Sequence, residues 1–341
     1  MSLKKYELYS IIVPSYNRQD EVKDLIKSFN ALDFPKNKFE LVIVDDGSTD
    51  GTAEYLRSIH AKLELNLVII EQENQGPGAA RNNGMQNSNG DFLIIIDSDC
   101  TVPQEWLNHI DSRLNEEQAD AFGGPDSYRS DFPALLKAIN YSMTSFLTTG
   151  GLRGRKGKNL AKFYPRSFNM GLSRKLFQQI GGFNQMYYGE DIEFSNRIIK
   201  SNAKVLFIED AFVYHKRRTN IPKFFRQVFR MGAARVTLFT IDPTLLEPLH
   251  AVPAFLFLIT TAVLLLAVFF TLFRLVLLIG LLLTAGILIY AMLDSVRIYR
   301  QIIPGLWLPV IIPLQVSAYA SGFLVGFIKI FLLTKKEKVI A

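Results

Sequence analysis

The C-terminal third of the chain limits its fold most strongly, because long parts of it carry no charged residue. Of the 341 residues, those at 251–273, 275–293 and 301–328 include no Asp, Glu, Lys or Arg. A helix needs roughly 20 such residues to cross the apolar core of a bilayer, where every backbone polar group must be satisfied within the protein. The sequence therefore predicts a transmembrane region at 251–333 with about three hydrophobic segments, 251–273, 275–293 and 304–333.

The third segment is open to more than one interpretation. Only Arg274 separates the first two segments, which predicts a tight hairpin, but the third contains three prolines within 304–313, so its first part is open to a kinked, an interfacial or a re-entrant arrangement. Basic residues favour the cytoplasmic side of a membrane, so three spans would place the basic tail at 334–341 on the other side. A re-entrant third segment would remove this conflict. Gly322 and Gly326 form a small-xxx-small pair in this segment, which predicts close packing against another helix.

Immediately before this region, residues 219–250 are predicted to form an amphipathic basic segment. Between Val213 and Val236 there are seven Lys or Arg and no acid. At helical spacing, one face carries Phe224, Phe225, Val228 and Phe229, and another carries Lys223, Arg226 and Arg230. Such a helix is suited to lying on an anionic membrane leaflet. The alternative is an ordinary surface helix that packs its phenylalanines on the domain.

Residues 1–218 have a different pattern, in which short apolar runs alternate with amphipathic ones. Strands are predicted at 9–16, 39–48, 66–72 and 91–99, and helices at 20–32, 49–61 and 76–88. Ser48 or Thr49 is the predicted cap of the second helix. This alternation predicts an α/β domain with a mostly parallel, doubly wound sheet.

Polar residues follow three of the predicted strands, at Pro14–Tyr16, Asp45–Asp46 and Asp97–Asp99. In doubly wound sheets ligands bind beyond the carboxyl ends of the strands, so these residues are expected at one crevice. Asp97 and Asp99 follow the apolar run 94–96 directly, although burying a carboxylate is costly unless something compensates it. They either cap a turn in water or hold a cation that acts on a charged substrate.

The composition of the chain indicates the cellular compartment of the N-terminal domain and the class of its binding partners. The single cysteine, Cys100, excludes an intramolecular disulfide and suits a reducing compartment. No signal-peptide pattern precedes the first strand, so the N-terminal domain is expected in the cytoplasm. The net charge of +6 fits nucleic acid or an anionic membrane surface, and the apolar C-terminal region favours the membrane over nucleic acid.

A glycine-rich basic stretch at 150–162 also has two interpretations. It is either a solvated loop or a lid that closes over phosphate. The side chains that would approach the phosphate are among Arg153, Arg155, Lys156 and Lys158.

Five motifs occur in order along the N-terminal domain: IIVPSYNR, VDDGSTDGT, NQGPGAARNNG, IDSDC and GGFNQMYYGEDIEFSNRI. Together they resemble glycosyltransferase family 2, the inverting group with the GT-A fold, over residues 8–235. The hydrophobic segments resemble those of its membrane-anchored branch. The resemblance implies a Rossmann-like GT-A catalytic domain at 1–218, followed by the interfacial segment, the transmembrane region and the basic tail.

In this family, acids one residue apart at a strand end hold a divalent cation, and Asp97 and Asp99 resemble that DxD motif. Transfer of a sugar from a nucleotide diphosphate leaves a diphosphate, whose charge Mg²⁺ or Mn²⁺ neutralises, and both ions prefer carboxylate and phosphate oxygens. His215 matches a histidine that completes the metal site in some relatives. Its alternative role is structural.

The resemblance also implies a nucleotide-sugar site. Its residues would be Pro14, Tyr16, Asp45, Asp46, Arg81 and Asp97. Asp46 would accept a hydrogen bond from the base, with Pro14 and Tyr16 as the wall beside it. Asp45 would share that role or order the turn, and Arg81 either lies near the nucleotide or forms a surface salt bridge.

Glu190 and Asp191 match the acidic pair of the family. An inverting transfer needs a base for the acceptor hydroxyl, and the second acid of the pair has this role in relatives, which implies Asp191. Glu190 would bind the acceptor or support the loop, and the alternative role of Asp191 is to cap a helix. Further on, Gln227 and Arg230 resemble the QxxRW motif of processive synthases and imply an acceptor or interface role, but Met231 replaces the tryptophan.

The function expected from these residues is that of a membrane-anchored inverting glycosyltransferase with its catalytic domain in the cytoplasm. It would use Mn²⁺ or Mg²⁺ and move a sugar from a nucleotide-diphosphate donor, by default a UDP-sugar, to a lipid, polyprenyl-phosphate or lipid-linked glycan acceptor. The alternatives are a processive polysaccharide synthase and a non-catalytic membrane scaffold. A dinucleotide-dependent oxidoreductase is disfavoured, because GPGAARNNG follows the third strand and not the first.

Overall fold

The computed structural model describes residues 6–60, 63–129, 131–149, 163–186, 188–216 and 220–333. The predictions for the basic stretch at 150–162, with Arg153, Arg155, Lys156 and Lys158, and for the tail at 334–341 lie outside the described residues. The chain forms two compact units, of which the first comprises described residues up to 127 and from 163 to 216. The second comprises 128–149 and 220–333, so it includes a segment from within the stretch predicted as the catalytic domain.

The first unit is built on a seven-stranded sheet. Its strand order is β3 (Leu67–Glu71), β2 (Phe39–Asp45), β1 (Tyr9–Ser15), β4 (Phe92–Ile96), β8 (Asn169–Ser173), β6 (Ala121–Gly123) and β9 (Val205–Phe207). Among these strands only β8 runs antiparallel to its neighbours. The predicted mostly parallel sheet is therefore confirmed.

Helices cover both faces of this sheet, so its central strands are buried on both sides, as is usual for parallel strands. Neighbouring residues of β1 contribute to different clusters: Ile11 packs with α1 (Gln19–Asn30), α2 (Thr52–His60) and α4 (Trp106–Glu117). Ile12 packs with α3 (Pro77–Gln86), α7 (Arg174–Ile180) and α8 (Glu190–Lys200). This alternation is the doubly wound arrangement expected from the sequence.

Two local features position the site. Gly84 of α3 lies so close to β1 that a Cβ atom there would approach Cγ2 of Ile12 to 2.6 Å, so the glycine lets α3 pack against the strand. The predicted cap of α2 is wrong: the helix begins at Thr52, whose backbone N–H donates to Oδ1 of Asp50. Ser48 and Thr49 instead bind Asn17 in the loop after β1.

A second, three-stranded sheet joins distant parts of the first unit. Its order is β5 (Cys100–Thr101), β10 (Val213–His215) and β7 (Asp126–Ser127). The pairing places His215 opposite Cys100 and Val213 opposite Asp126. Residues more than 80 positions apart in the sequence are thus brought together at the end of β4.

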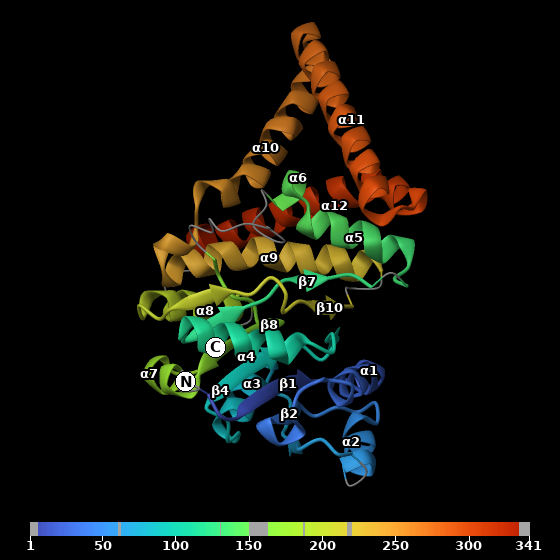
Figure 1. The fold of residues 1–341 in the computed structure, drawn as a ribbon. Helices are drawn as coiled ribbons and strands as arrows, with labels where there is room; N and C mark the ends of the chain where they lie inside the picture. The colour runs from blue at the N-terminus through green and yellow to red at the C-terminus, as the bar shows by residue number, and fades with distance from the viewer. Residues whose placement is uncertain are drawn as a thin grey trace. The chain divides into compact units, whose positions relative to one another are not determined.

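The second unit is helical. It contains α5 (Ala134–Thr144), α6 (Phe146–Thr149), α9 (Ile221–Ile241), a short helix at Pro243–Leu245, α10 (Pro248–Phe269), α11 (Thr271–Tyr299) and α12 (Ile302–Phe327), which continues as a π-helix to Leu333. Among the described residues three helices are long and apolar enough to cross a membrane: Pro248–Phe269, Thr271–Tyr299 and Ile302–Leu333. Figure 1 shows α10 and α11 as a hairpin and α12 alongside α9. Arg274 closes the hairpin by donating to the carbonyl groups of Ala267 and Val268.

The packing of α9 corrects the predicted apolar face. Phe224 and Val228 are buried in a cluster with residues of α5 and α12, whereas Phe225 is 38% exposed and its ring lies 6.5 Å from that of Phe229. The four residues predicted to share one face are therefore divided between the protein core and the surface. Phe224 and Val228 pack within the second unit and not on the sheet of the first, and the exposed remainder of α9 includes Lys223, Arg226 and Arg230.

Candidate active site

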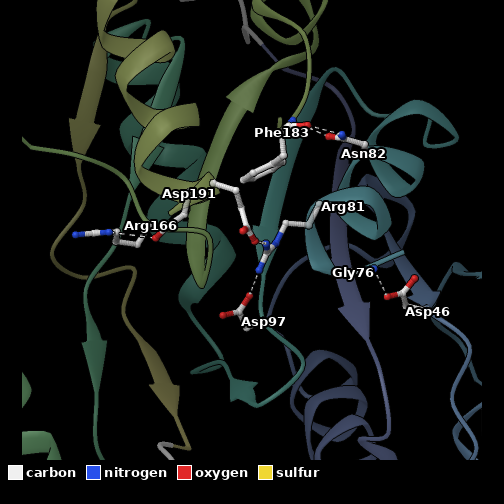
Figure 2. Close-up of polar contacts among 9 residues, drawn as sticks. Asp46, Gly76, Arg81, Asn82, Asp97, Arg166, Phe183 and Asp191 are labelled. Atoms are coloured by element: carbon white, nitrogen blue, oxygen red, sulfur yellow. Dashed lines mark hydrogen bonds and ion pairs between the residues drawn. The ribbon is translucent and has the colours of Figure 1, made fainter. Parts of the chain in front are cut away.

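Four of the six residues predicted to bind the nucleotide sugar lie at the carboxyl ends of β1 and β2, namely Pro14, Tyr16, Asp45 and Asp46. Asp46 is buried, and its carboxylate organises the loop between β3 and α3. Oδ1 accepts from the Gln72 side chain at 2.7 Å and from the Gln75 N–H at 2.9 Å, and Oδ2 accepts from the Gly76 N–H at 2.9 Å. The contact with Gly76 is drawn in Figure 2. Asp46 thus fixes the turn before α3, and its contact with a nucleotide base stays a prediction.

Asp45 and Ser15 are opposite each other on β2 and β1, and both are buried. Oδ2 of Asp45 accepts from the Ser48 N–H at 3.2 Å, which gives Asp45 the turn-ordering role considered for it. Among the described residues, Oδ1 of Asp45 and Oγ of Ser15 have no hydrogen-bond partner. Pro14 is buried in β1, and Tyr16 just beyond the strand is 49% exposed.

Arg81 forms the centre of the site. It is only 5% exposed, so the interpretation of a surface salt bridge is wrong. Its Nη2 lies 2.8 Å from Oδ1 of Asp97, and its Nη1 lies 3.0 Å from Oε1 of Glu190. Figure 2 shows the guanidinium group of Arg81 pointing toward Asp97. Burial alone would lower the pKa of Arg81, but the charges of Asp97 and Glu190 raise it above its ordinary value, so the side chain stays charged.

The loop before α8 is held against α3 next to Arg81. Asn82 accepts from the N–H of Phe183 at 2.7 Å and donates to its carbonyl group at 2.8 Å. The guanidinium of Arg81 lies 5.3 Å from the centre of the Phe183 ring, within the range of a cation–π contact. These contacts, also drawn in Figure 2, set the start of α8 relative to α3.

Glu190 and Asp191 begin α8 and have different surroundings. Burial raises the pKa of Glu190, against the opposing effect of Arg81. Asp191 does not cap the helix, because Gly189 is the N-cap residue and accepts from the N–H groups of Ile192 and Glu193. Its Oδ2 instead lies 3.1 Å from Nη1 of Arg166.

Arg166 was not predicted from the sequence. It precedes β8 and is 25 residues from Asp191, and none of the recognised motifs includes it. The only signal is a basic residue just before an apolar strand, which is too common to indicate a site.

Two of the three predicted metal ligands, Asp99 and His215, come together at the second sheet, whereas Asp97 is paired with Arg81. Ligand atoms of Asp99, Cys100 and His215 all lie within 4.8 Å of one another. Nε2 of His215 is 3.2 Å from Oδ1 of Asp99, and its Nδ1 is 3.6 Å from Oδ2 of Asp126. Burial would lower the pKa of His215, but the charges of Asp99 and Asp126 raise it to about 9. A second carboxylate thus faces the imidazole from β7, which the sequence did not predict.

Of the three side chains in this cluster, Asp99 and His215 offer ligand atoms that suit Mn²⁺ or Mg²⁺. A carboxylate and an imidazole are suitable ligands for Mn²⁺, and carboxylates for Mg²⁺. Burial raises the pKa of the Cys100 thiol well above its usual value, and sulfur is a soft ligand that Mn²⁺ and Mg²⁺ do not favour. Asp97 is engaged with Arg81 through Oδ1. Asp99 and His215 are therefore the better candidates.

Gln227 and Arg230 lie on α9 in the second unit, where Gln227 is partly buried and Arg230 is exposed. Their acceptor role stays a prediction.

Comparison with known proteins gives a consistent result. Residues 10–181 match the family model described as Glycosyl transferase family 2. The chain is 26% identical to Glycosyltransferase AglE of Haloferax volcanii over 234 residues, which cover 68% of this chain and 74% of that one. It is 36% identical over 112 residues to a poly(ribitol-phosphate) beta-N-acetylglucosaminyltransferase, TarS, of Staphylococcus aureus, but spans only 20% of that protein and 33% of its own length.

Among solved structures, the mannosyltransferase PcManGT from Pyrobaculum calidifontis, in complex with GDP-Man and Mn²⁺, is similar over 94% of this chain and 87% of that one. The TM-score is 0.61 at 21% sequence identity. This likeness concerns the fold, and it agrees with the GT-A architecture expected from the sequence.

Proposed function

The chain belongs to glycosyltransferase family 2, and from this premise we propose that it is a membrane-anchored inverting transferase acting on a lipid or lipid-linked acceptor. The donor is a nucleotide-diphosphate sugar, and the catalytic domain is cytoplasmic. The observation that carries the proposal is the position of Arg81, whose guanidinium bridges Asp97 to Glu190. The buried guanidinium of Arg81 thereby joins Asp97, which is predicted to face the donor, to Glu190, which is predicted to lie near the acceptor.

In the proposed reaction Asp191 acts as the general base. Its carboxylate accepts the proton of the acceptor hydroxyl while that oxygen attacks the anomeric carbon. The bond to the diphosphate breaks, the nucleoside diphosphate leaves with the electron pair, and the configuration is inverted. A positioned base of this kind contributes about 10²–10⁴-fold to the rate.

The neighbours of Asp191 suit this role. Arg166 lies 3.1 Å from Oδ2 of Asp191 and so orients the carboxylate. Glu190, beside it in the sequence, is paired with Arg81 and so supports the loop. We assign the proton-accepting role to Asp191 because its side chain is 28% exposed, against 14% for that of Glu190, and is therefore the more accessible to an acceptor hydroxyl.

Asp99 and His215 would hold Mn²⁺ or Mg²⁺ at the end of β4, with Asp97 beside them. When bound, the ion supplies charge neutralisation for the departing diphosphate. Asp97 is held by Arg81 on one oxygen, so the ion pair with this buried arginine orients its carboxylate.

The named relatives support a donor and acceptor class. The staphylococcal relative is a beta-N-acetylglucosaminyltransferase, and a relative in Methanococcus voltae, 25% identical over 236 residues, acts on a dolichyl-linked sugar phosphate according to its name. The match to the Methanococcus voltae relative covers 66% of this chain, so we favour a lipid-linked acceptor. A UDP-sugar is the first donor to test.

Two alternatives are less well supported. A processive synthase would be expected to retain QxxRW, but Met231 occupies the tryptophan position. A scaffold without activity would be expected to lose its catalytic acids, whereas Asp97, Asp99 and Asp191 are all present.

The test is a transfer assay on the full chain in detergent or bilayers. A panel of UDP- and GDP-sugars is supplied with polyprenyl phosphate or lipid-linked sugar acceptors, with and without Mn²⁺. Transfer from one nucleotide sugar to a lipid acceptor supports the proposal. Transfer only to soluble acceptors, or repeated addition to one product, would contradict it.

A further inference from the structure

We propose that the chain crosses the membrane twice, through α10 and α11, and that α9 and α12 lie together along the lipid head groups on the side of the catalytic unit. The inference rests on the proposed membrane attachment and concerns only the second unit. It differs from the count suggested by length and hydropathy, which makes the segment Ile302–Leu333 a third candidate span.

The first observation is that α9 and α12 run side by side in the same direction. A Cβ atom on Gly322 would approach the carbonyl oxygen of Phe229 to 1.9 Å, and one on Gly326 would lie 3.2 Å from Cα of Ala233. Further along, the rings of Phe239 and Phe331 have centroids 6.2 Å apart. Residue numbers rise together in both helices, so their courses are parallel. The predicted small-xxx-small pair thus packs against α9.

The second observation concerns the charges of α9. This helix has 21 residues and carries Lys223, Arg226, Arg230 and Arg235. They are distributed through its first fifteen positions, so a transmembrane α9 would place cations at the centre of the bilayer, where they are strongly disfavoured. Among the described helices α9 is not one of the candidate spans. A helix that packs along it for most of its length must lie at the same depth.

The order of the helices leads to the same result. If α9 lies along the surface, α10 leaves the catalytic side and α11 returns to it, so α12 begins on that side. If α9 instead crossed the membrane, then α10, α11 and α12 would cross in alternating directions, and α12 would run antiparallel to α9. The observed parallel course excludes this. In Figure 1 the α10–α11 hairpin rises away from the adjacent pair of α9 and α12.

The exposed side chains of α12 indicate what this helix faces outside the protein. Its buried positions include Leu308, Ile311 and Phe323, while Ile303, Leu306 and Val310 are at least half exposed along the opposite side. An apolar stripe on α12 next to exposed cations on α9 matches the boundary between acyl chains and anionic head groups. The occupant of this surface is therefore an anionic bilayer. The basic tail at 334–341 would then follow α12 on the cytoplasmic side, as the distribution of basic residues favours.

The test uses single cysteines added to the full chain in sealed membrane vesicles of known orientation. One cysteine is appended after Ala341, one replaces Glu54 on the exposed side of α2 (Glu54→Cys), and one replaces Phe270 in the hairpin turn (Phe270→Cys). The native Cys100 is 1% exposed, and the unaltered chain measures its background. A membrane-impermeant maleimide then reports which cysteines share a side.

The appended cysteine is expected to label on the same side as Glu54→Cys, and Phe270→Cys only on the other side. Leu272→Cys, 67% exposed, serves as a second hairpin position if Phe270→Cys fails to assemble. Labelling of the appended cysteine together with the hairpin positions would overturn the inference while leaving membrane attachment intact. If carbonate washing releases the protein from the vesicles, the proposed membrane-anchored function fails as well.

Discussion

Two acids adjacent in the sequence, Glu190 and Asp191, have different arginine partners. Glu190 is paired with the buried Arg81, and Asp191 with the more exposed Arg166. The motif identifies the pair, and the three-dimensional contacts show that its two members have different surroundings. The same applies to the candidate metal site, where His215 lies between Asp99 and Asp126.

The role of Asp191 can be tested with Asp191→Asn, which keeps the size of the side chain but removes the basic oxygen. Transfer should fall by about 10²–10⁴-fold, the usual contribution of a general base. Nucleotide-sugar affinity should change little, because Asp46, Arg81 and Asp97 remain. Steady-state transfer and donor binding by calorimetry give the two values. Near-normal transfer by a folded Asp191→Asn protein would move the base elsewhere, and Glu190→Gln would then be the next variant.

The role of Asp126 can be tested through metal affinity. A carboxylate that faces the second nitrogen of a ligating histidine orients the ring, and its loss usually weakens metal binding about 10–100-fold. Asp126→Asn should therefore lower the affinity for Mn²⁺ measured by electron paramagnetic resonance without substrate. Asp210→Asn, at an exposed position of the same unit, is the matched control. Equal affinities for the two variants would show that His215 does not need Asp126 or does not bind the ion.

At the scale of elements, the turn before α3 depends on one carboxylate. Asp46→Asn leaves a single oxygen for the N–H groups of Gln75 and Gly76, which both bind the carboxylate in the native chain. An unsatisfied buried donor costs about 1–3 kcal/mol, so thermal stability should fall and nucleotide affinity should fall with it. Glu73→Gln, exposed in the same loop, should change neither quantity. A stable Asp46→Asn protein with normal nucleotide affinity would contradict the anchoring role.

The contact between α9 and α12 has a test of its own in two glycines. At Gly322 a Cβ atom would collide with the backbone of α9, whereas at Gly286 of α11 nothing lies within 4 Å. Gly322→Ala should destabilise the protein by about 1–3 kcal/mol, the usual cost of overpacking. Gly286→Ala should be neutral or stabilising by about 0.5–1 kcal/mol, because alanine is the better helix former. Unfolding temperatures in one detergent compare the two, and equal effects would argue against the close contact.

The elements of the first unit were predictable because their signals are local. The runs that became β1, β2 and β4 are mostly apolar, and the helices between them have amphipathic spacing. The acids at the strand ends were also predictable, because the carboxyl ends of parallel strands meet at one edge. Arg166 and Asp126 were not, because each reaches its partner through a pairing that no local pattern encodes. The divided apolar face of α9 was missed for the same reason, since its burial depends on α12.

The whole molecule is interleaved, with residues 128–149 belonging to the second unit although both flanking stretches belong to the first. Within the second unit, Lys137 of α5 donates to Gln301 at 3.0 Å, and Asn140 donates to the hydroxyl of Tyr299 at 3.0 Å. The Tyr141 hydroxyl donates to Asp294 of α11 at 2.8 Å. Removal of α10, α11 and α12 would therefore take away the side chains that α5 and α9 pack against. Both α5 and α9 would remain in the shortened chain.

This arrangement predicts the behaviour of a chain shortened to residues 1–247, which lacks α10, α11 and α12. Side chains that are buried in the full protein, including Ile139, Phe224 and Val228, would become exposed together. Large apolar patches of this kind drive association, so the shortened chain should aggregate in buffer and be rescued by detergent. Its binding to vesicles should persist at high salt, because salt screens charges but does not weaken apolar burial. Light scattering and vesicle flotation across a salt series measure both effects. A shortened chain that is monomeric in buffer and leaves anionic vesicles as salt rises would show instead that α9 meets the membrane through its charges alone and does not need α12.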